Sequence, residues 1–342
     1  MVAQLDSRFV RIAPGRAVSR LIGYSLFEGR PATTTGQWWN PVVFANLRHA
    51  AKRSPAPVDR PIFIVGMGRS GTTLLGRILA AHPDVGFLNE PKAMWHVVRP
   101  DEDIIGSYAS RAGRLYLDAK DADPEAIARC RALFAWYLRL SRSRRVVDKY
   151  PELVFRSEFA RAIFPDARFL VAVRSPWSTL KSVSGWSSTH GNEREDWWGV
   201  DDRKWKVLWE QAVSKGRHQD LAELDLGAES DHYARAAVEW IVSMRESAQL
   251  AESDPGAHLV PYEKLAQRPG ETVAEILAFC ELRASPRTES YAEEIVSATD
   301  RAAELRAEME ERLPAQLVSK LDETWARLTD MKAPGAEHSP RA

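Results

Sequence analysis

The sequence is poor in cysteine and has no long apolar segment. Only Cys130 and Cys280 occur in 342 residues. Two cysteines are too few for a disulfide framework, and both fit better as small core residues. No run approaches the roughly 18 consecutive apolar residues that a membrane-spanning helix needs. The first 30 residues lack the apolar core and the cleavage site of a signal peptide. These absences predict a soluble protein of the cytoplasm.

The chain also lacks an excess of charge of either sign. Lys and Arg together number 47, as do Asp and Glu. We therefore expect no recruitment of nucleic acid or of an anionic membrane by overall charge, and any anion must be held by a local site. Neither cysteine stands at metal-ligand spacing from a histidine, and an acidic run such as Asp101–Asp103 is typical of a solvated face. No metal site is expected.

From about residue 61 onward, short apolar strands alternate with amphipathic helices. Strands are predicted at 61–65, 85–88, 145–147, 168–173 and 258–260, and helices at 72–81, 152–163, 231–250 and from Ser175 onward, with a terminal helix that carries Leu317 to Leu328. This alternation predicts an α/β fold of the phosphate-loop kind, with three layers in which helices cover both faces of a central parallel sheet.

The chain divides into three predicted parts. Residues 1–60 form an N-terminal leader, either loosely ordered or packed on the domain, that ends in a proline-rich linker. Residues 61–331 form the main domain, which carries a tryptophan-rich insert near 186–209. Residues 332–342 are predicted to be a disordered tail.

Five polar residues each follow a predicted strand: Arg69, Glu90, Lys149, Arg174 and Tyr262. Ligands of open parallel sheets bind outside the carboxyl ends of the strands. The five side chains are therefore expected to line one site.

The segment Gly66–Thr73 lies between the first predicted strand and the helix that follows. Its glycines let backbone amides turn inward, and the helix start adds free N–H groups, so the segment suits a phosphate. Thr72 stands where an ATP-type loop needs lysine, and the cation of this loop is Arg69 instead. The residues expected to bind the ligand are Gly68, Arg69, Ser70, Gly71, Thr72 and Thr73.

The run Gly-x-x-Arg-Ser-Gly-Thr-Thr-Leu-Leu after a buried strand resembles the 5′-phosphosulfate loop of the sulfotransferase family, in its broad bacterial branch. A second motif agrees, because the family's 3′-phosphate site has an arginine, a proline two residues on and a serine eight residues on. Here these are Arg174, Pro176 and Ser182. An arginine can hold a phosphate through two parallel hydrogen bonds, and the serine adds a hydroxyl.

Further similarities extend the resemblance over about residues 61 to 283. Asp148–Pro151 resembles the family's Lys-Thr-Pro segment, and Phe164–Phe169 resembles its approach to the 3′-phosphate strand. Val260–Leu265 resembles its Arg-Tyr-Glu-Asp-Leu segment, which implies that Tyr262 lies near the adenine. The glycine-rich, basic C-terminal motif of the cytosolic branch has no counterpart, which makes steroid and phenol acceptors less expected.

The resemblance implies a sulfotransferase that uses 3′-phosphoadenosine 5′-phosphosulfate as co-substrate. Sulfuryl transfer is an in-line displacement that needs positioning and charge stabilisation. We expect Glu90 to act as the base, with His82 and His96 as weaker rivals. Arg69 and Lys149 are expected to stabilise the sulfuryl oxygens and the leaving phosphate. Because arginine can neutralise that phosphate, no divalent ion is required.

The acceptor side is expected in the tryptophan-rich insert. Trp197 and Trp198 are predicted to form a lid or an acceptor wall, with His96 nearby, whereas Trp205 and Trp209 are predicted to face the core. Aromatic faces suit sugar rings and flat natural products, so a glycan, lipid or natural-product acceptor is expected. The sequence leaves open the acceptor itself, O- or N-sulfation and whether the chain forms a homo-oligomer.

Two other functions are compatible with part of the pattern. The first is a nucleotide-dependent kinase, which the missing loop lysine disfavours. The second is a non-catalytic relative that binds a nucleotide or a glycan. The presence of Glu90, Arg69 and Arg174 together disfavours it.

Overall fold

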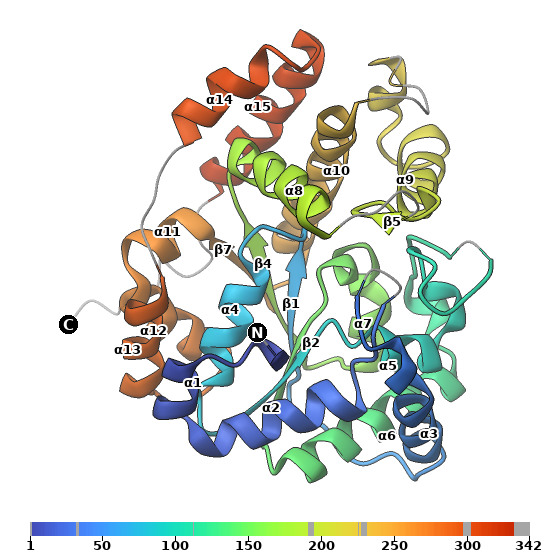
Figure 1. Ribbon diagram of the computed structural model, residues 1–342, viewed down its shortest axis with the longest axis vertical. Helices are drawn as coiled ribbons and strands as arrows, with labels where there is room; N and C mark the ends of the chain where they lie inside the picture. Colours follow the sequence, from blue (N-terminus) through green and yellow to red (C-terminus); the bar gives the residue numbers. More distant parts are fainter. Residues whose placement is uncertain are drawn as a thin grey trace.

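The computed structural model describes residues 2–31, 34–111, 113–190, 195–224, 226, 231–296 and 302–331. Its centre is a parallel sheet of five strands in the order β2-β3-β1-β4-β7 (Figure 1). The strands are β1 (Ile62–Gly66), β2 (Val85–Asn89), β3 (Arg145–Lys149), β4 (Arg168–Val173) and β7 (Ala257–Pro261). The predicted tail 332–342 lies outside the described residues.

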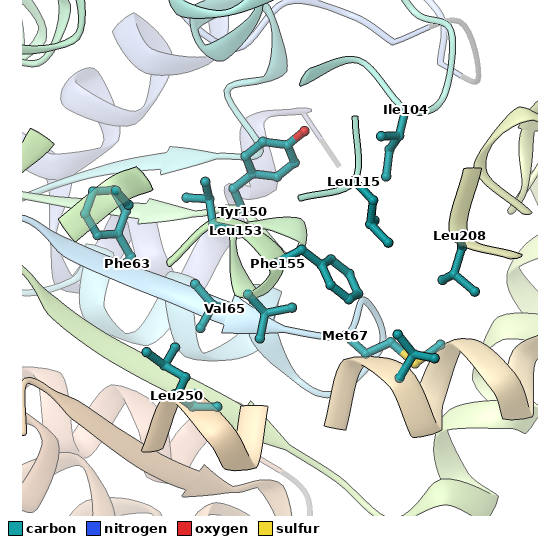
Figure 2. Packing of buried hydrophobic residues seen from close by; sticks show 14 of the residues in the cluster. Phe63, Val65, Met67, Ile104, Leu115, Tyr150, Leu153, Phe155, Leu208 and Leu250 are labelled. Atoms are coloured by element: carbon teal, nitrogen blue, oxygen red, sulfur yellow. The ribbon is translucent and has the colours of Figure 1, made fainter. Parts of the chain in front are cut away.

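Alternate residues of β1 pack on opposite faces of the sheet, as the pleat of a strand requires. Phe63 and Val65 belong to one hydrophobic cluster, and Ile62 and Ile64 belong to the other. Figure 2 shows the first cluster from close by, with Val65 and Met67 on the side of Phe155. Because β1 is buried on both faces, its sequence reads as an unbroken apolar run.

Helices cover both faces, so the predicted three-layer α/β fold is confirmed. One cluster is covered by α4 (Thr72–Ala80), α12 (Pro269–Phe279) and α13 (Pro286–Ile295). The other is covered mainly by α5 (Lys92–Val98), α6 (Pro124–Ser141), α7 (Ser157–Ile163) and α10 (His232–Ser253). In Figure 1, α12 and α13 lie to the left of α4.

The remaining elements connect these layers. The α-helices are α8 (Pro176–His190), α9 (Arg203–Leu208), α11 (Tyr262–Gln267), α14 (Ala302–Glu310) and α15 (Ala315–Asp330). The short helical segments are η1 (Val2–Gln4), η2 (Gln37–Trp39), η3 (Pro100–Glu102), η4 (Ala119–Asp121), η5 (Pro151–Arg156), the π-helix η6 (Trp209–Ser214) and η7 (Gln219–Leu224). Strands β5 (Glu195–Asp196) and β6 (Gly199–Val200) form a small antiparallel pair.

The described part of the leader packs on the domain as α1 (Ser7–Ile12), α2 (Pro14–Leu26) and α3 (Asn40–Ala51). Helix α2 lies along β2, the edge strand of the sheet (Figure 1). Arg16 and Arg20 donate hydrogen bonds to the backbone carbonyls of Val85 and Phe87, respectively. Arg20 is itself buried and paired with Glu28. The leader thus satisfies and covers an edge that would otherwise be open to other strands.

Two predictions about the fold differ from the structure. The helix expected over 152–163 is two elements, the 3-10 segment η5 followed by α7. The acidic run Asp101–Asp103 is not a solvated face, because Glu102 and Asp103 are only 2% and 3% exposed. Glu102 pairs with the buried Arg156. Asp103 accepts hydrogen bonds from four consecutive backbone N–H groups, so both charges are compensated inside the protein.

Both cysteines are buried and unpaired, as predicted. Among the helices that the structure describes, none is long and apolar enough to cross a membrane.

Candidate active site

The order of the strands brings the predicted residues together at one edge of the sheet. Strand β3 lies between β1 and β2, and Asn89, the last residue of β2, pairs with Lys149. Glu90 therefore stands next to Lys149. On the other side of β1, Gly66 pairs with Ala172, which places Arg174 beside the loop after β1. A parallel sheet delivers all these strand ends to the same side.

The phosphate loop has backbone angles that its glycines make accessible. Gly66 and Gly71 have φ values of 131° and 86°, in the region that favours glycine. A Cβ at Gly66 would lie 2.5 Å from the carbonyl oxygen of Ala172. Only glycine therefore allows the backbone to pass this close to β4 where the loop begins. Ser70 is 1% exposed, and its hydroxyl has no hydrogen-bond partner among the described residues.

Arg69 joins the loop to the predicted 3′-phosphate residues. Its Nε donates a hydrogen bond to Oγ of Ser182 at 2.9 Å, and Arg174 donates to its carbonyl oxygen at 3.1 Å. The guanidinium of Arg174 also lies 4.4 Å from the ring centroid of Tyr262. Desolvation and the nearby Arg174 cation lower the pKa of Arg69, against the opposing charge of Glu90. Two neighbouring cations repel each other, and an anion bound between them would relieve this repulsion.

Tyr262, the first residue of α11 directly after β7, borders the loop. A Cβ on Gly71 would lie 2.6 Å from the Tyr262 ring. Position 71 therefore favours glycine for two reasons, the positive φ and the close contact between its backbone and this ring. The tyrosine, Arg174 and Ser182 thus form one cluster on the flank of the phosphate loop.

Glu90 is held by two lysines. Lys149 donates a hydrogen bond to Oε1 of Glu90, and Nζ of Lys92 lies 3.9 Å from Oε2. Lys92 also pairs with Glu152 at 3.3 Å. Burial opposes the charge on Glu90, but Lys149 and Lys92 outweigh it and hold the pKa of Glu90 below its usual value. Glu90 therefore has a reduced affinity for a proton while its lysine partners stay in place.

A cavity of about 480 Å³ connects these groups. It is lined by Gly68, Arg69, Thr72 and Thr73 of the loop and by Glu90 and Lys149. Its far wall comes from α10, where Ser243 is 1% exposed and its hydroxyl lacks a partner among the described residues. A buried hydroxyl left unpaired beside a cavity is a group that a bound molecule can satisfy.

Of the two predicted wall tryptophans, Trp197 lines this cavity and Trp198 does not. Trp197 lies against the loop, where a Cβ on Gly68 would approach its ring at 2.6 Å. Trp198 is 1% exposed, packs edge-on against Trp205 and donates a hydrogen bond to His232 at 3.1 Å. The role predicted for Trp198 is corrected accordingly, because its side chain is buried against Trp205 and His232 and does not line the cavity. Residues 191–194 of the insert lie outside the described residues.

Neither rival base is in the cavity. His96 lies on α5 one turn beyond Lys92 and faces a different cavity, next to Phe44 and Tyr108. The predicted acceptor-side position of His96 is therefore corrected. His82 is fully buried, and its ring hydrogen-bonds to the carbonyl of Arg283 at 3.0 Å.

The sequence did not predict several residues that line the cavity. Lys92 follows Glu90 by two residues, and a cation so close to a candidate base could have been noticed. Glu239, Lys204 and Glu152 had no such signal. Lys204 pairs with Glu239 at 2.6 Å, and its Nζ lies 4.2 Å from the ring centroid of Trp197. Gln4, Pro31 and Thr34 of the leader also line the cavity.

No group of three or more His, Cys, Asp and Glu side chains in the described part of the chain is placed to hold a metal ion. The charged groups that line the cavity are instead lysines, Arg69 and carboxylates.

A glycine-rich loop between a central parallel strand and a helix, with its ligands at the carboxyl edge of the sheet, defines a phosphate-loop α/β protein. Its family is given by comparison with known proteins. Residues 61–286 match the model of the sulfotransferase family. The chain belongs to this family, whose members are enzymes.

The individual relatives are distant. The chain is 24% identical over 231 residues to the nodulation protein NoeE of Sinorhizobium fredii, which covers 66% of this chain and 51% of NoeE. The chain thus spans about half the length of that curated relative. Sulfotransferase STF1 of Mycobacterium tuberculosis is 19% identical, with 95% of this chain and 94% of that one covered and a TM-score of 0.46. Sulfotransferase STF9 of Mycobacterium avium is 15% identical, with 81% and 78% covered and a TM-score of 0.45.

Proposed function

We propose that the protein transfers a sulfuryl group from 3′-phosphoadenosine 5′-phosphosulfate to a hydroxyl or amine of a glycan, lipid or natural-product acceptor. One observation carries the proposal. The phosphate loop has the cluster of Arg174, Ser182 and Tyr262 on one side and the lysine-held carboxylate of Glu90 on the other. Arg69 of the loop is hydrogen-bonded to the cluster and lines the same cavity as Glu90. The donor has two phosphate groups and one reacting sulfur, which matches this division of the site.

The donor's phosphates would be held at two places. The amides at the start of α4, the hydroxyl of Ser70 and the side chains of Thr72 and Thr73 suit the 5′-phosphate, because a helix N-terminus with unpaired donors favours an anion. Arg174 and Ser182 suit the 3′-phosphate, and Tyr262 would lie near the adenine. The three-residue cluster beside the loop makes this donor a better fit than ATP, which has no 3′-phosphate.

Glu90 would act as the base by exchange of its lysine partner. In the structure Lys149 donates a hydrogen bond to Glu90, and this pair lowers the affinity of the carboxylate for a proton. The 5′-phosphosulfate brings new negative charge to the end of β3, and Lys149 would turn toward its oxygens. That step releases Glu90 to take the proton of the acceptor during attack at sulfur. Lys149 and Arg69 would then neutralise the phosphate that departs.

The test uses ³⁵S-labelled donor with a panel of glycan, lipid and natural-product acceptors, and compares the wild type with Glu90→Gln. Label should pass to at least one acceptor, and the variant should lose about 10²- to 10⁴-fold in kcat, the usual contribution of a general base. Binding of adenosine 3′,5′-bisphosphate, measured by calorimetry, should persist in the variant. Turnover unimpaired in Glu90→Gln would remove the base assignment.

A thermal-shift assay and the labelled donor separate the other two functions. A kinase would be stabilised by ATP with Mg²⁺ and not by the bisphosphate in a thermal-shift assay. A non-catalytic relative would bind the bisphosphate but leave the label on the donor with every acceptor offered.

A further inference from the structure

A second cavity, of about 840 Å³, lies apart from the phosphate loop, among α3, α5 and α6. These three helices lie together at the lower right of Figure 1. The second cavity shares no lining residue with the first, although α5 contributes Lys92 to one and His96 to the other. The proposed sulfuryl transfer makes no use of it.

Three aromatic rings form the wall of this cavity. Phe44 of α3 packs edge-on against Tyr108, with ring centroids 5.2 Å apart, and against His96 at 6.1 Å. His96 and Tyr108 are 5.4 Å apart, so all three rings touch one another. On α3, Asn40, Phe44, Arg48 and Ala51 follow at helical spacing and face the cavity together. Such a wall accommodates a flat aromatic body by stacking and edge contacts.

The rim of the cavity carries positive charge that is not neutralised within the described part of the chain. Arg48 on α3 and Lys52 just after it are both exposed, and neither forms an ion pair with a described carboxylate. Glu125, which also lines the cavity, is paired with Arg129 four residues on. The guanidinium of Arg48 lies 5.5 Å from the ring centroid of Phe44. A ligand that stacks on this ring would therefore meet a cation at its edge.

A polar atom inside the aromatic wall also lacks a partner. Nδ1 of His96 is buried and makes no hydrogen bond to any described residue. Desolvation lowers the pKa of His96, against the nearby charge of Asp103. A neutral imidazole with one free nitrogen can accept or donate a single hydrogen bond to a bound molecule, depending on its tautomer.

We infer that this cavity binds a small amphipathic anion, with a flat aromatic body against Phe44, His96 and Tyr108 and a carboxylate or sulfonate head toward Arg48 and Lys52. The body would displace water from the aromatic wall, and the head would gain charge-assisted hydrogen bonds. Both parts are needed, because neither an exposed lysine alone nor an open aromatic wall alone confers much affinity. The inference does not depend on the proposed sulfuryl transfer.

The probe for the test is 1-naphthoate, with 1-naphthalenemethanol as a neutral ligand of nearly the same shape. Isothermal titration calorimetry of the full chain should show one site for naphthoate. The alcohol should bind at least about tenfold more weakly, as expected for the loss of a charge-assisted contact. Equal affinities for the two ligands would overturn the role of the cations.

Three variants locate the site. The double variant Arg48→Glu with Lys52→Glu should weaken naphthoate binding about tenfold or more, and because both side chains are on the rim it should keep the melting temperature. The matched control reverses two exposed lysines elsewhere, Lys120→Glu with Lys215→Glu, and should leave binding unchanged. Arg69→Ala should also leave it unchanged. Loss of naphthoate binding in Arg69→Ala, or full binding in the Arg48 and Lys52 variant, would assign the anion to another site and contradict the inference.

Discussion

Lys149 and Glu90 are bound to each other through both side chain and backbone. The lysine ammonium donates to the Glu90 carboxylate, and the backbone N–H of Glu90 donates to the carbonyl oxygen of Lys149 at 2.7 Å. The second bond continues the pairing with β3 one residue past the end of β2, which holds Glu90 in place with a φ of 49°. A residue other than glycine in that conformation is uncommon and is often found at functional sites.

The first prediction follows from this pair. Lys149→Met removes the largest charge that opposes the burial of Glu90, so the pKa of Glu90 should rise. If the ionised carboxylate is the base, the acid limb of the pH profile of kcat/KM lies below the ordinary glutamate value in the wild type and moves to higher pH in the variant. The measurement is kcat/KM against pH, with Lys215→Met as a control at an exposed lysine.

The position of the limb is the readout in that experiment, not the height of the profile. The rate itself should also fall, by about 10²- to 10³-fold if Lys149 stabilises developing charge. An acid limb that stays at the same pH in Lys149→Met would show that Glu90 is not the titrating base.

The second prediction concerns Arg174. If Arg174 holds the 3′-phosphate, Arg174→Gln should weaken adenosine 3′,5′-bisphosphate binding by roughly 10- to 100-fold, which corresponds to about 1.5–3 kcal/mol for hydrogen bonds to a charged group. Adenosine 5′-phosphate, which lacks the 3′-phosphate, should bind both proteins alike. Glutamine is chosen because it can still donate to the carbonyl of Arg69, to which Arg174 donates in the wild type.

Calorimetry with the two nucleotides gives the answer directly. An equal loss of affinity for both ligands would mean that Arg174 supports the loop as a whole. Arg144→Ala, at an exposed arginine just before β3, serves as the control for a general change of charge.

The third prediction concerns the contact between Gly68 and Trp197. Gly68→Ala would put a methyl group 2.6 Å from the indole ring, so the ring must leave the loop. Trp197 is also held by a hydrogen bond to Glu239 at 2.6 Å, which the displacement would strain. We expect kcat/KM to fall at least about tenfold, since small displacements in an active site are costly.

The controls for this contact use a second glycine and a second background. A methyl group added to Gly185 on α8 would meet no other atom within 4 Å, so Gly185→Ala should be neutral or slightly stabilising. In a Trp197→Ala background, Gly68→Ala should have little further effect, because the partner of the clash is gone. Additive effects of the two substitutions would contradict the contact as the cause.

The sequence predicts the strands and their polar ends well, because those signals are local. An apolar run that stops at a glycine, as at Gly66, needs no knowledge of the rest of the chain. The pairing of Lys149 with Glu90 is not local, since it depends on β3 lying beside β2. The sequence pattern alone does not predict that these two strands are neighbours in the sheet. Glu239 illustrates the limit, because α10 also carries Glu246 and Glu252, and nothing in its sequence marks Glu239 as the one that lines this cavity.

The tryptophan-rich insert and the leader show two further limits. Trp197 and Trp198 are adjacent and chemically identical, and only the direction of the backbone decides which one reaches the loop. In the leader, nothing in the sequence marks Arg20 and Glu28 as buried, yet they are a buried pair that fixes α2 on the edge of the sheet. Charged residues are buried only when compensated, and the compensation is visible only in three dimensions.

The last prediction concerns Asp148, which lies on β3 directly before Lys149. Its side chain is fully buried, and Trp95 donates a hydrogen bond to Oδ2 at 2.9 Å. Burial raises the pKa of Asp148 to about 8, against the smaller opposing effect of that hydrogen bond. In the unfolded chain an aspartate has a pKa of about 3.9. Between these values the folded protein holds a proton that the unfolded chain has released, so stability falls as pH rises.

Asp148→Asn removes this titration and keeps an oxygen for the Trp95 hydrogen bond. Relative to the wild type, the variant should therefore gain stability as pH rises from about 5 to about 8, by on the order of 2 to 4 kcal/mol. The measurement is the free energy of unfolding in urea at several pH values, with Asp330→Asn at the exposed end of α15 as the control. A difference between Asp148→Asn and the wild type that is independent of pH, or that shrinks as pH rises, would show that Asp148 is ionised in the folded protein.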